Sequence, residues 1–174
     1  VTGASSGFGT AIARQFARSW PDVRIVLVAR RTERLTALAA ELKVPTHVVS
    51  LDVRDRAEVE RTLGNLPSDF AEVDVLVNSA GLALGLQPGF EADVDDWDRM
   101  VQTNVAGLMY VTRTILPGMV ARKRGHIINL GSVAGSYPYP GGHVYGGTKA
   151  FVQQFSLGLR ADLIGTRVRV TCIE

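Results

Sequence analysis

Short, nearly continuous apolar runs recur along the chain and predict β-strands that are covered on both faces. Runs of this kind are typical of parallel sheets, because helices pack on both sides of such a sheet. Val1 precedes a glycine-rich turn and is read as the end of a strand. The other predicted strands cover residues 24–29, 47–51, 74–78, 125–131 and 167–174.

Segments with apolar positions three or four residues apart alternate with these runs and predict amphipathic helices. Leucines at positions 35, 38 and 42 mark one of them. Asp93 is expected to cap the fourth helix, and Pro117 is expected to bend or end it. The predicted helices cover residues 10–20, 32–42, 54–66, 94–114 and 142–164.

This alternation predicts an α/β fold built on a doubly wound parallel sheet with right-handed crossovers. We find no linker, internal repeat or low-complexity segment, so residues 1–174 are expected to form a single domain. A strand that feeds such a turn usually needs about five residues. We therefore expect the first strand to start before Val1.

The glycine-rich turn is Thr2-Gly-Ala-Ser-Ser-Gly-Phe-Gly9. Glycine lets a backbone turn tightly and approach a ligand without a Cβ in the way. The helix that follows directs free N–H groups and the positive end of its dipole at the turn, which suits a pyrophosphate. The spacing differs from the common Gly-x-Gly-x-x-Gly, and a simple strand-to-helix turn is the alternative. We predict a Rossmann-type dinucleotide site with Gly3, Ser5, Ser6, Phe8 and Gly9 at the phosphates.

Arg30 and Arg31 follow the strand at residues 24–29. In a dinucleotide fold this position meets the adenosine ribose, where an acid bonds a free 2′-hydroxyl and an arginine accommodates a 2′-phosphate. The pair therefore favours NADP over NAD, although both arginines could simply be solvated. Asp52 and Val53 follow the next strand as further cofactor contacts. Asp52 could bond the adenine amino group or cap the next helix, and both alternatives stay open.

Small residues follow the strand at residues 74–78 and would let a cofactor lie close to the sheet. We therefore add Asn78, Ala80 and Gly81 to the predicted cofactor site. The apolar loop at residues 82–88 could line the mouth of a pocket. Asn104 lies in an apolar stretch of helix, and a buried asparagine needs partners. A structural hydrogen bond is the alternative to a functional role there.

Residues 132–149 bring together the Ser132 hydroxyl, the Tyr145 phenol and the Lys149 ammonium. Tyr145 and Lys149 are four residues apart, so a helix that begins near Gly142 carries both on one face. A phenol is a weak acid with a reference pKa of about 10. A nearby cation favours the phenolate, so the pair can exchange protons. The alternative is an ordinary surface Tyr and an ordinary surface Lys. Tyr137, Tyr139 and His143 in the preceding loop could contact the substrate, and packing is the alternative for them.

These motifs together resemble the short-chain dehydrogenase/reductase family over the whole segment. The turn Thr2-Gly-x-x-x-Gly-x-Gly9 resembles its cofactor turn, and Asn78-Ser-Ala-Gly81 is similar to its Asn-Asn-Ala-Gly, with Ser79 replacing the second Asn. The positions that match its catalytic residues are Asn104, Ser132, Tyr145 and Lys149. A closer resemblance is to the bacterial NADP-dependent 3-hydroxy acid (serine or allo-threonine) dehydrogenases, through residues 76–85, 116–120, 125–129, 145–152 and 154–157.

The resemblance implies hydride transfer between NADP and the 3-hydroxyl carbon of a small 3-hydroxy acid, such as serine, allo-threonine or 3-hydroxypropionate. It implies that Tyr145 is the acid/base and that Ser132 bonds the substrate oxygen. It further implies that Lys149 supports Tyr145 and binds the nicotinamide ribose, so that both contact the cofactor, and that Asn104 holds a water linked to Lys149. A substrate loop and a last strand would follow Glu174.

Family members are usually tetramers, and the helices at residues 94–114 and 142–164 would supply the contacts. Two other functions stay open. A broader NADPH-dependent carbonyl reductase would use the same residues. A non-catalytic NADP-binding protein would not need Tyr145 and Lys149 together. A sugar-nucleotide epimerase also uses Tyr-x-x-x-Lys, but the glycine spacing fits it less well.

Composition limits the remaining classes of function. The 174 residues are 46% hydrophobic and 21% charged, which suits one globular α/β domain. The net charge is +2 without a Lys/Arg block, so nucleic acid is not indicated. No apolar run approaches the ~18 residues of a membrane helix, no signal peptide is evident, and no metal site is predicted. The one cysteine, Cys172, allows no disulfide within the chain, and we expect a cytoplasmic protein.

Overall fold

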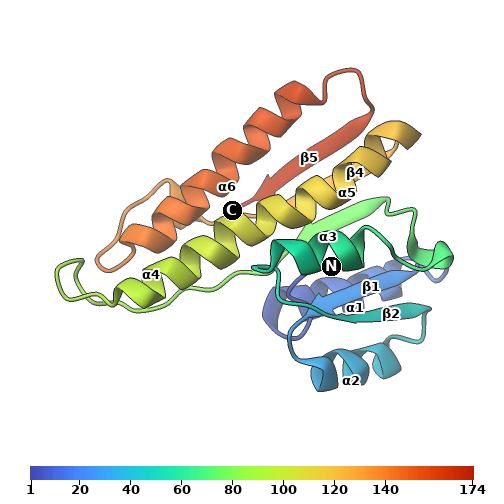
Figure 1. The fold of residues 1–174 in the computed structure, drawn as a ribbon, viewed down its shortest axis with the longest axis horizontal. Helices are drawn as coiled ribbons and strands as arrows, with labels where there is room; N and C mark the ends of the chain where they lie inside the picture. Colours follow the sequence, from blue (N-terminus) through green and yellow to red (C-terminus); the bar gives the residue numbers. More distant parts are fainter.

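The computed structural model describes residues 1–174 as parallel strands that alternate with helices (Figure 1). The strands are β1 (Ile25–Ala29), β2 (Thr46–Ser50), β3 (Val75–Asn78), β4 (Gly125–Leu130) and β5 (Val168–Ile173). The helices are α1 (Gly7–Ser19), α2 (Thr32–Leu42), α3 (Arg56–Leu63), α4 (Val94–Val101), α5 (Leu108–Arg122) and α6 (His143–Asp162). Short helical turns are η1 (Ser68–Phe70), η2 (Gln102–Gly107) and η3 (Val133–Gly135). The Rossmann-type α/β fold is thereby confirmed. None of the helices combines the length and the hydropathy that a membrane crossing needs.

Residues 1–2 connect two groups of strands. Strand β2 pairs with β1, and β3, β4 and β5 pair in that order, all in parallel. The Thr2 N–H donates to the Val77 carbonyl at 3.0 Å, and the Val28 N–H donates to the Val1 carbonyl at 3.0 Å. The order is therefore β2, β1, residues 1–2, β3, β4, β5. The direction of the connections reverses at residues 1–2, so the glycine turn leaves the sheet at the switch point where such folds bind ligands.

A cavity of a different kind lies away from this turn, at the amino ends of β1 and β3. It has a volume of about 650 Å³ and a mainly apolar lining that includes Phe16 of α1 and Ile115 of α5. Residues 1–2 border it, but the rest of the glycine turn does not. Ser132, Tyr145 and Lys149 do not line this cavity, and neither does the glycine turn beyond Thr2, so we do not assign the functional site there.

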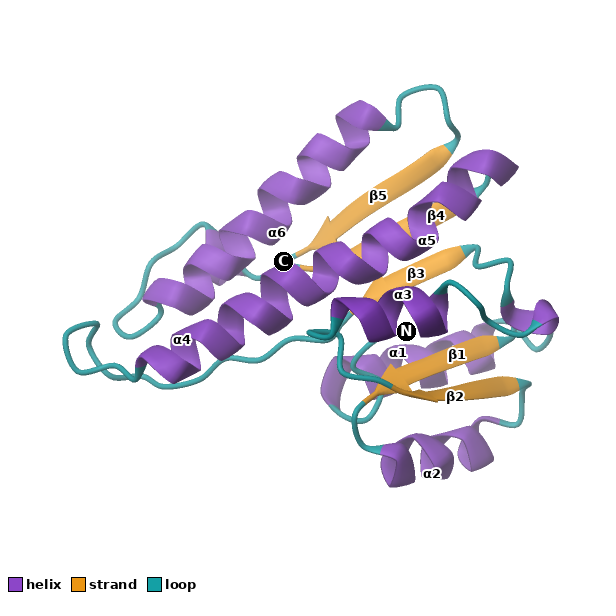
Figure 2. Ribbon diagram, in the orientation of Figure 1, coloured by secondary structure: helices purple, strands orange, loops and turns teal.

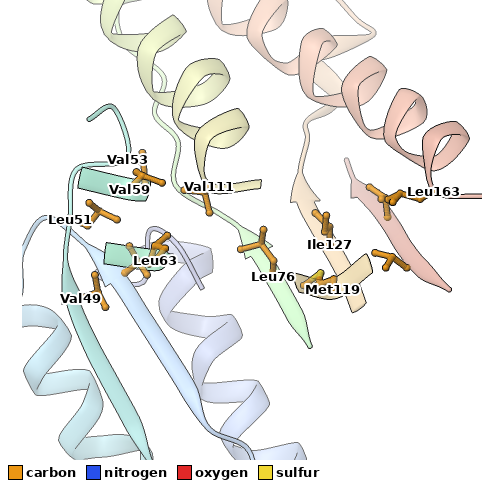
Figure 3. Packing of buried hydrophobic residues seen from close by; sticks show 13 residues of the cluster. Val49, Leu51, Val53, Val59, Leu63, Leu76, Val111, Met119, Ile127 and Leu163 are labelled. Atoms are coloured by element: carbon orange, nitrogen blue, oxygen red, sulfur yellow. The ribbon is translucent and has the colours of Figure 1, made fainter. Parts of the chain in front are cut away.

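Buried hydrophobic residues form two clusters, on opposite faces of the sheet. Leu27 belongs to one cluster and Val28 to the other, as expected because successive residues of a strand point to opposite faces. The larger cluster packs α3 and α5 on the strands, with Val59 and Leu63 from α3 and Val111 and Met119 from α5 (Figure 3). The smaller cluster packs α1 and α2 on β1 and includes Leu35, Leu38 and Leu42. The predicted apolar stripe of α2 is therefore buried.

The long helix predicted over residues 94–114 differs in the structure. Asp93 caps it as expected, since its carboxylate accepts the Asp95 N–H at 2.9 Å. The helix then passes from α4 through a π-helical turn, η2, into α5 (Figure 2). Its predicted end is wrong, because α5 contains Pro117 and continues to Arg122. Met119 is fully buried, and Arg122 Nη2 donates to the Val73 carbonyl at 2.9 Å, so tertiary contacts hold the turn beyond the proline.

Candidate functional site

The glycine turn joins the switch point to the N-terminus of α1. Gly3 has a φ of +66°, and a Cβ there would lie 2.8 Å from the Ser79 carbonyl oxygen, so the position requires glycine. Ser6 stands at the N-cap of α1 but its side chain makes no capping hydrogen bond. The first N–H groups of α1 therefore have no side-chain acceptor. Together with the helix dipole, they form a favourable position for a phosphate.

Arg31 reaches from the end of β1 to this turn. Its Nε and Nη2 donate to Ser5 Oγ at 3.2 and 3.0 Å, and Nη2 also donates to Ser6 Oγ at 2.9 Å. Arg30 is exposed beside it and directly follows β1. Guanidinium groups and hydroxyls thus border one edge of the turn. This is a donor set that suits a phosphate group.

A cavity of about 290 Å³ opens at this end of the sheet. Most of the predicted cofactor residues line it: Gly3, Ser5, Ser6, Phe8, Arg30, Arg31, Asp52, Val53, Ala80 and Gly81. Thr103 of η2 lines it as well, although no sequence motif marks that residue. Gly9, Asn78, Tyr145 and Lys149 are outside this lining. Gly9 is buried against the Gly3 backbone, which lets α1 approach the turn closely.

Asp52 lies in the cavity lining and is not the cap of α3. That cap is Asp55, whose carboxylate accepts the Glu58 N–H at 2.9 Å. Asp52 instead accepts from the Arg54 N–H at 3.1 Å and from its Nε at 3.0 Å. The Arg54 guanidinium holds the pKa of the Asp52 carboxyl below its ordinary value. Of the two alternatives for Asp52, the helix cap is therefore wrong, and the adenine contact stays a prediction.

Buried polar side chains lie behind the lining of the cavity and hydrogen-bond the segments that form it. Thr2 Oγ1 accepts the N–H groups of Ser79 and Ala80, both at 3.0 Å, and so ties the glycine turn to the segment after β3. Asn78 is 3% exposed and donates through Nδ2 to Thr112 Oγ1 and Asn129 Oδ1, both at 2.9 Å. Asn78 thus lies beneath the cavity rather than in its lining.

Tyr145 and Lys149 project from the same face of α6. Lys149 Nζ lies 5.7 Å from the centroid of the Tyr145 ring. The ammonium is buried and donates to the Leu130 carbonyl at 2.7 Å, and this burial lowers the pKa of Lys149 below its ordinary value. A Cβ at Gly81 would lie 3.8 Å from Lys149 Nζ. Because Gly81 lines the cavity, Lys149 stands at its edge.

Ser132 follows Gly131 after the end of β4 and caps the short helix η3. Its Oγ accepts the Ala134 N–H at 3.2 Å, which fixes the oxygen and leaves the hydroxyl hydrogen without an acceptor. The carboxyl end of a parallel strand is where ligands meet such a sheet. Ser132 therefore presents a donor on the same side of the molecule as the glycine turn.

Asn104 is 2% exposed within η2. Its Nδ2 donates to the Leu82 carbonyl at 2.8 Å and to Thr148 Oγ1 at 3.1 Å, and its Oδ1 accepts the Leu82 N–H at 2.9 Å. Asn104 thereby joins the loop after Gly81 to α6. Thr148, next to Lys149, is a contact that the sequence analysis missed, because only the packing of η2 on α6 brings it to Asn104.

The arrangement supports proton exchange beside an anion-binding cavity. A phenol beside an ammonium can give and take a proton, and a fixed hydroxyl can bond an oxygen on which charge develops. No group of three or more His, Cys, Asp or Glu side chains is placed to hold a metal ion. The chemical groups that the site brings together are a phenol, an ammonium and a hydroxyl.

The sequence matches the family described as short chain dehydrogenase over residues 1–174. It is 55% identical over 174 residues to the NADP-dependent 3-hydroxy acid dehydrogenase YdfG of Escherichia coli K12, covering 100% of this chain and 69% of that protein. It is 51% identical over 175 residues to the serine 3-dehydrogenase of Agrobacterium fabrum, with the same coverage of 100% and 69%.

Solved structures of similar proteins superpose closely. The crystal structure of serine dehydrogenase from Escherichia coli gives a TM-score of 0.93 at 54% identity, covering 99% of this chain and 79% of that chain. The closed form of serine dehydrogenase complexed with NADP+ gives a TM-score of 0.94 at 54% identity, covering 100% of this chain and 69% of that chain.

Proposed function

Because this chain belongs to the short-chain dehydrogenase family, we propose that it transfers hydride between NADP and the 3-hydroxyl carbon of a small 3-hydroxy acid. Serine, allo-threonine and 3-hydroxypropionate are examples of the proposed class of substrate. The reverse reaction reduces a semialdehyde. The observation that carries the proposal is the Tyr145–Lys149 face of α6, which adjoins a cavity bordered by Arg30 and Arg31.

The residues of the cavity fit NADP. A Cβ at Gly3 or Gly9 would strike neighbouring backbone, so the turn is built for close approach, and the N-terminus of α1 faces it. Arg31, bonded to Ser5 and Ser6, would hold the 2′-phosphate together with Arg30. Asp52 and Val53 would border the adenine. When bound, NADP supplies the hydride acceptor for oxidation and the hydride donor for reduction.

Tyr145 would move the proton. As phenolate it takes the proton of the substrate 3-hydroxyl during oxidation, and as phenol it returns that proton during reduction. The Lys149 ammonium, oriented by the Leu130 carbonyl, favours the phenolate. The Ser132 hydroxyl hydrogen, which lacks an acceptor, bonds the substrate oxygen while charge develops on it. Asn104 would hold a water through which Lys149 exchanges protons with solvent.

Steady-state assays test this function. We expect turnover of 3-hydroxy acids with NADP, at a kcat/KM at least about tenfold above that with NAD or with uncharged alcohols, since about 1.4 kcal/mol of discrimination gives that ratio. Equal turnover of uncharged alcohols would favour the broader carbonyl reductase. Binding of NADP without turnover of either class would favour a non-catalytic role.

We further propose that copies of the chain assemble as a tetramer through α4 and α6. Apolar side chains on these helices are exposed, with Val94 at 60%, Val101 at 41% and Leu157 at 47%. Sedimentation velocity should give a tetrameric mass that Leu157→Glu lowers, and a monomeric mass of the unmodified protein would contradict the proposal.

A reducing cytoplasm would suit the free Cys172, and cell fractionation would test that location.

A further inference from the structure

His143, the first residue of α6, is held through both ring nitrogens. The Val144 N–H donates to Nδ1 at 3.0 Å, so Nδ1 is the acceptor and the ring hydrogen sits on Nε2. Nε2 lies 3.2 Å from the Gln87 carbonyl oxygen and donates to it. The ring also meets the Trp97 indole edge-on, with 5.1 Å between centroids. Contacts with α6, with α4 and with the segment before α4 therefore set the orientation of this ring.

The partner of His143 is the segment 82–92, which connects the end of the cofactor cavity to α4. A second contact joins the same elements, because Gly141 has a φ of +77° and a Cβ there would strike the Leu86 backbone. A Cβ at Gly89 would lie 3.6 Å from His143 Cδ2. The segment 82–92 is thus attached to the start of α6 in the region of Leu86 to Gly89.

The other end of the segment 82–92 is attached one and a half helical turns further along α6. Leu82 is bonded to Asn104, and Asn104 is bonded to Thr148. Tyr145 lies on α6 between these two attachments, at Thr148 and at His143. The segment therefore runs beside the helical turn that carries the phenol, and releasing either attachment would shift it relative to Tyr145.

Resting on the function proposed above, we propose that His143 is a positioning residue for the hydroxy acid substrate. It holds the segment 82–92 as one wall of the substrate site beside Tyr145. His143 is absent from the lining of the cofactor cavity, and its ring bonds Gln87 and Val144 rather than Ser132 or Lys149. Its effect therefore falls on binding of the organic substrate, and not on NADP binding or proton transfer.

Steady-state kinetics with serine and NADP test this role. His143→Ala removes the ring and both hydrogen bonds, and a neutral hydrogen bond contributes about 1 kcal/mol net, or about fivefold in affinity. We expect the KM for serine to rise about tenfold, while kcat changes less than about threefold and the KM for NADP is unchanged. His143→Gln, whose amide can donate to the Gln87 carbonyl, should recover most of the loss. Gln154→Ala, on the exposed surface of α6, is the matched control and should behave as the unmodified protein.

An unchanged KM for serine in His143→Ala, or a rise in the KM for NADP of the same size, would overturn the inference. Trp97 gives an independent readout in a Trp20→Phe background, because it is then the sole tryptophan. Release of the segment should increase acrylamide quenching of Trp97 in His143→Ala, and unchanged quenching would count against the attachment. If the unmodified protein turns over no 3-hydroxy acid, the proposed function fails, and the quenching alone decides whether His143 holds the segment.

Discussion

The ammonium of Lys149 lies 5.7 Å from the centroid of the Tyr145 ring, and the two side chains stand one turn apart on α6. At this distance a cation is attracted to an aromatic face. The ammonium is 9% exposed and is directed by the Leu130 carbonyl, so its place beside the ring is fixed by the end of β4. This relationship gives a phenol a defined charge partner at the edge of the cofactor cavity.

Tyr145→Phe removes only the phenol oxygen and leaves the ring beside Lys149. Because a positioned acid/base contributes about 10²- to 10⁴-fold, we expect kcat to fall by about 10³. The dissociation constant of NADPH, measured by fluorescence titration, should change by less than about threefold, since the cavity lining is untouched. Activity close to that of the unmodified protein would show that another group transfers the proton.

The pH dependence of stability should carry a signature of Lys149. Burial lowers its pKa from the ordinary value of 10.5, so the folded chain releases this proton at a lower pH than the unfolded chain. Between those two pKa values the unfolded chain binds more protons, and the contribution of Lys149 to stability rises with pH. Below both pKa values Lys149 is protonated in the folded and in the unfolded chain, and the folded chain then carries the full free-energy cost of burying the ammonium. Lys149→Met lacks this dependence.

Thermal denaturation of the two proteins measures the effect. The Tm of the unmodified protein minus that of Lys149→Met should increase as the pH rises toward 10.5, the ordinary pKa of lysine. Over the same range kcat should decline, because the phenol loses its cationic neighbour. A difference in Tm that does not vary with pH would mean that burial does not disfavour the ammonium.

Much of the fold follows from local pattern. The helix predicted over residues 32–42 has its observed bounds, because Leu35, Leu38 and Leu42 form one stripe that the structure buries. The glycine turn could be located because the positive φ of Gly3 and the crowding around it leave a direct mark on residue type. Tyr145 and Lys149 could be paired because helical periodicity alone brings positions four apart together.

Other features depend on contacts that no local pattern carries. The π-helical turn η2 places Asn104 against Leu82 and Thr148, which are far from it in sequence. Pro117 suggests a helix end, but burial of Met119 keeps α5 helical beyond it. Threonine is a residue type that mostly lies at the surface, so the places of Thr103 and Thr148 in the site emerge only from packing.

Arg31→Ala should reduce the preference for NADP. The variant removes the guanidinium that bonds Ser5 and Ser6 at the edge of the cavity. A charged hydrogen bond contributes about 1.5–3 kcal/mol, so we expect the ratio of kcat/KM with NADP to that with NAD to fall by about 10- to 100-fold. Arg34→Ala, an exposed arginine of α2 outside the cavity lining, is the matched control and should keep the ratio. An equal fall in both variants would point to general electrostatic attraction instead of a specific contact.

Asn129 connects two buried polar groups across the core, and its loss should destabilise the fold. Its Oδ1 accepts from Asn78 Nδ2 and its Nδ2 donates to Ser156 Oγ, both at 2.9 Å, and the residue is fully buried. Asn129→Ala leaves both partners without a bond to Asn129 and opens a small cavity, so we expect the free energy of unfolding to fall by about 2–4 kcal/mol in urea denaturation. Ser156→Ala removes one of the same bonds. The double variant should therefore lose less than the sum of the two single losses, because the Asn129–Ser156 bond is counted in both. Strictly additive losses would mean that this bond contributes nothing to stability.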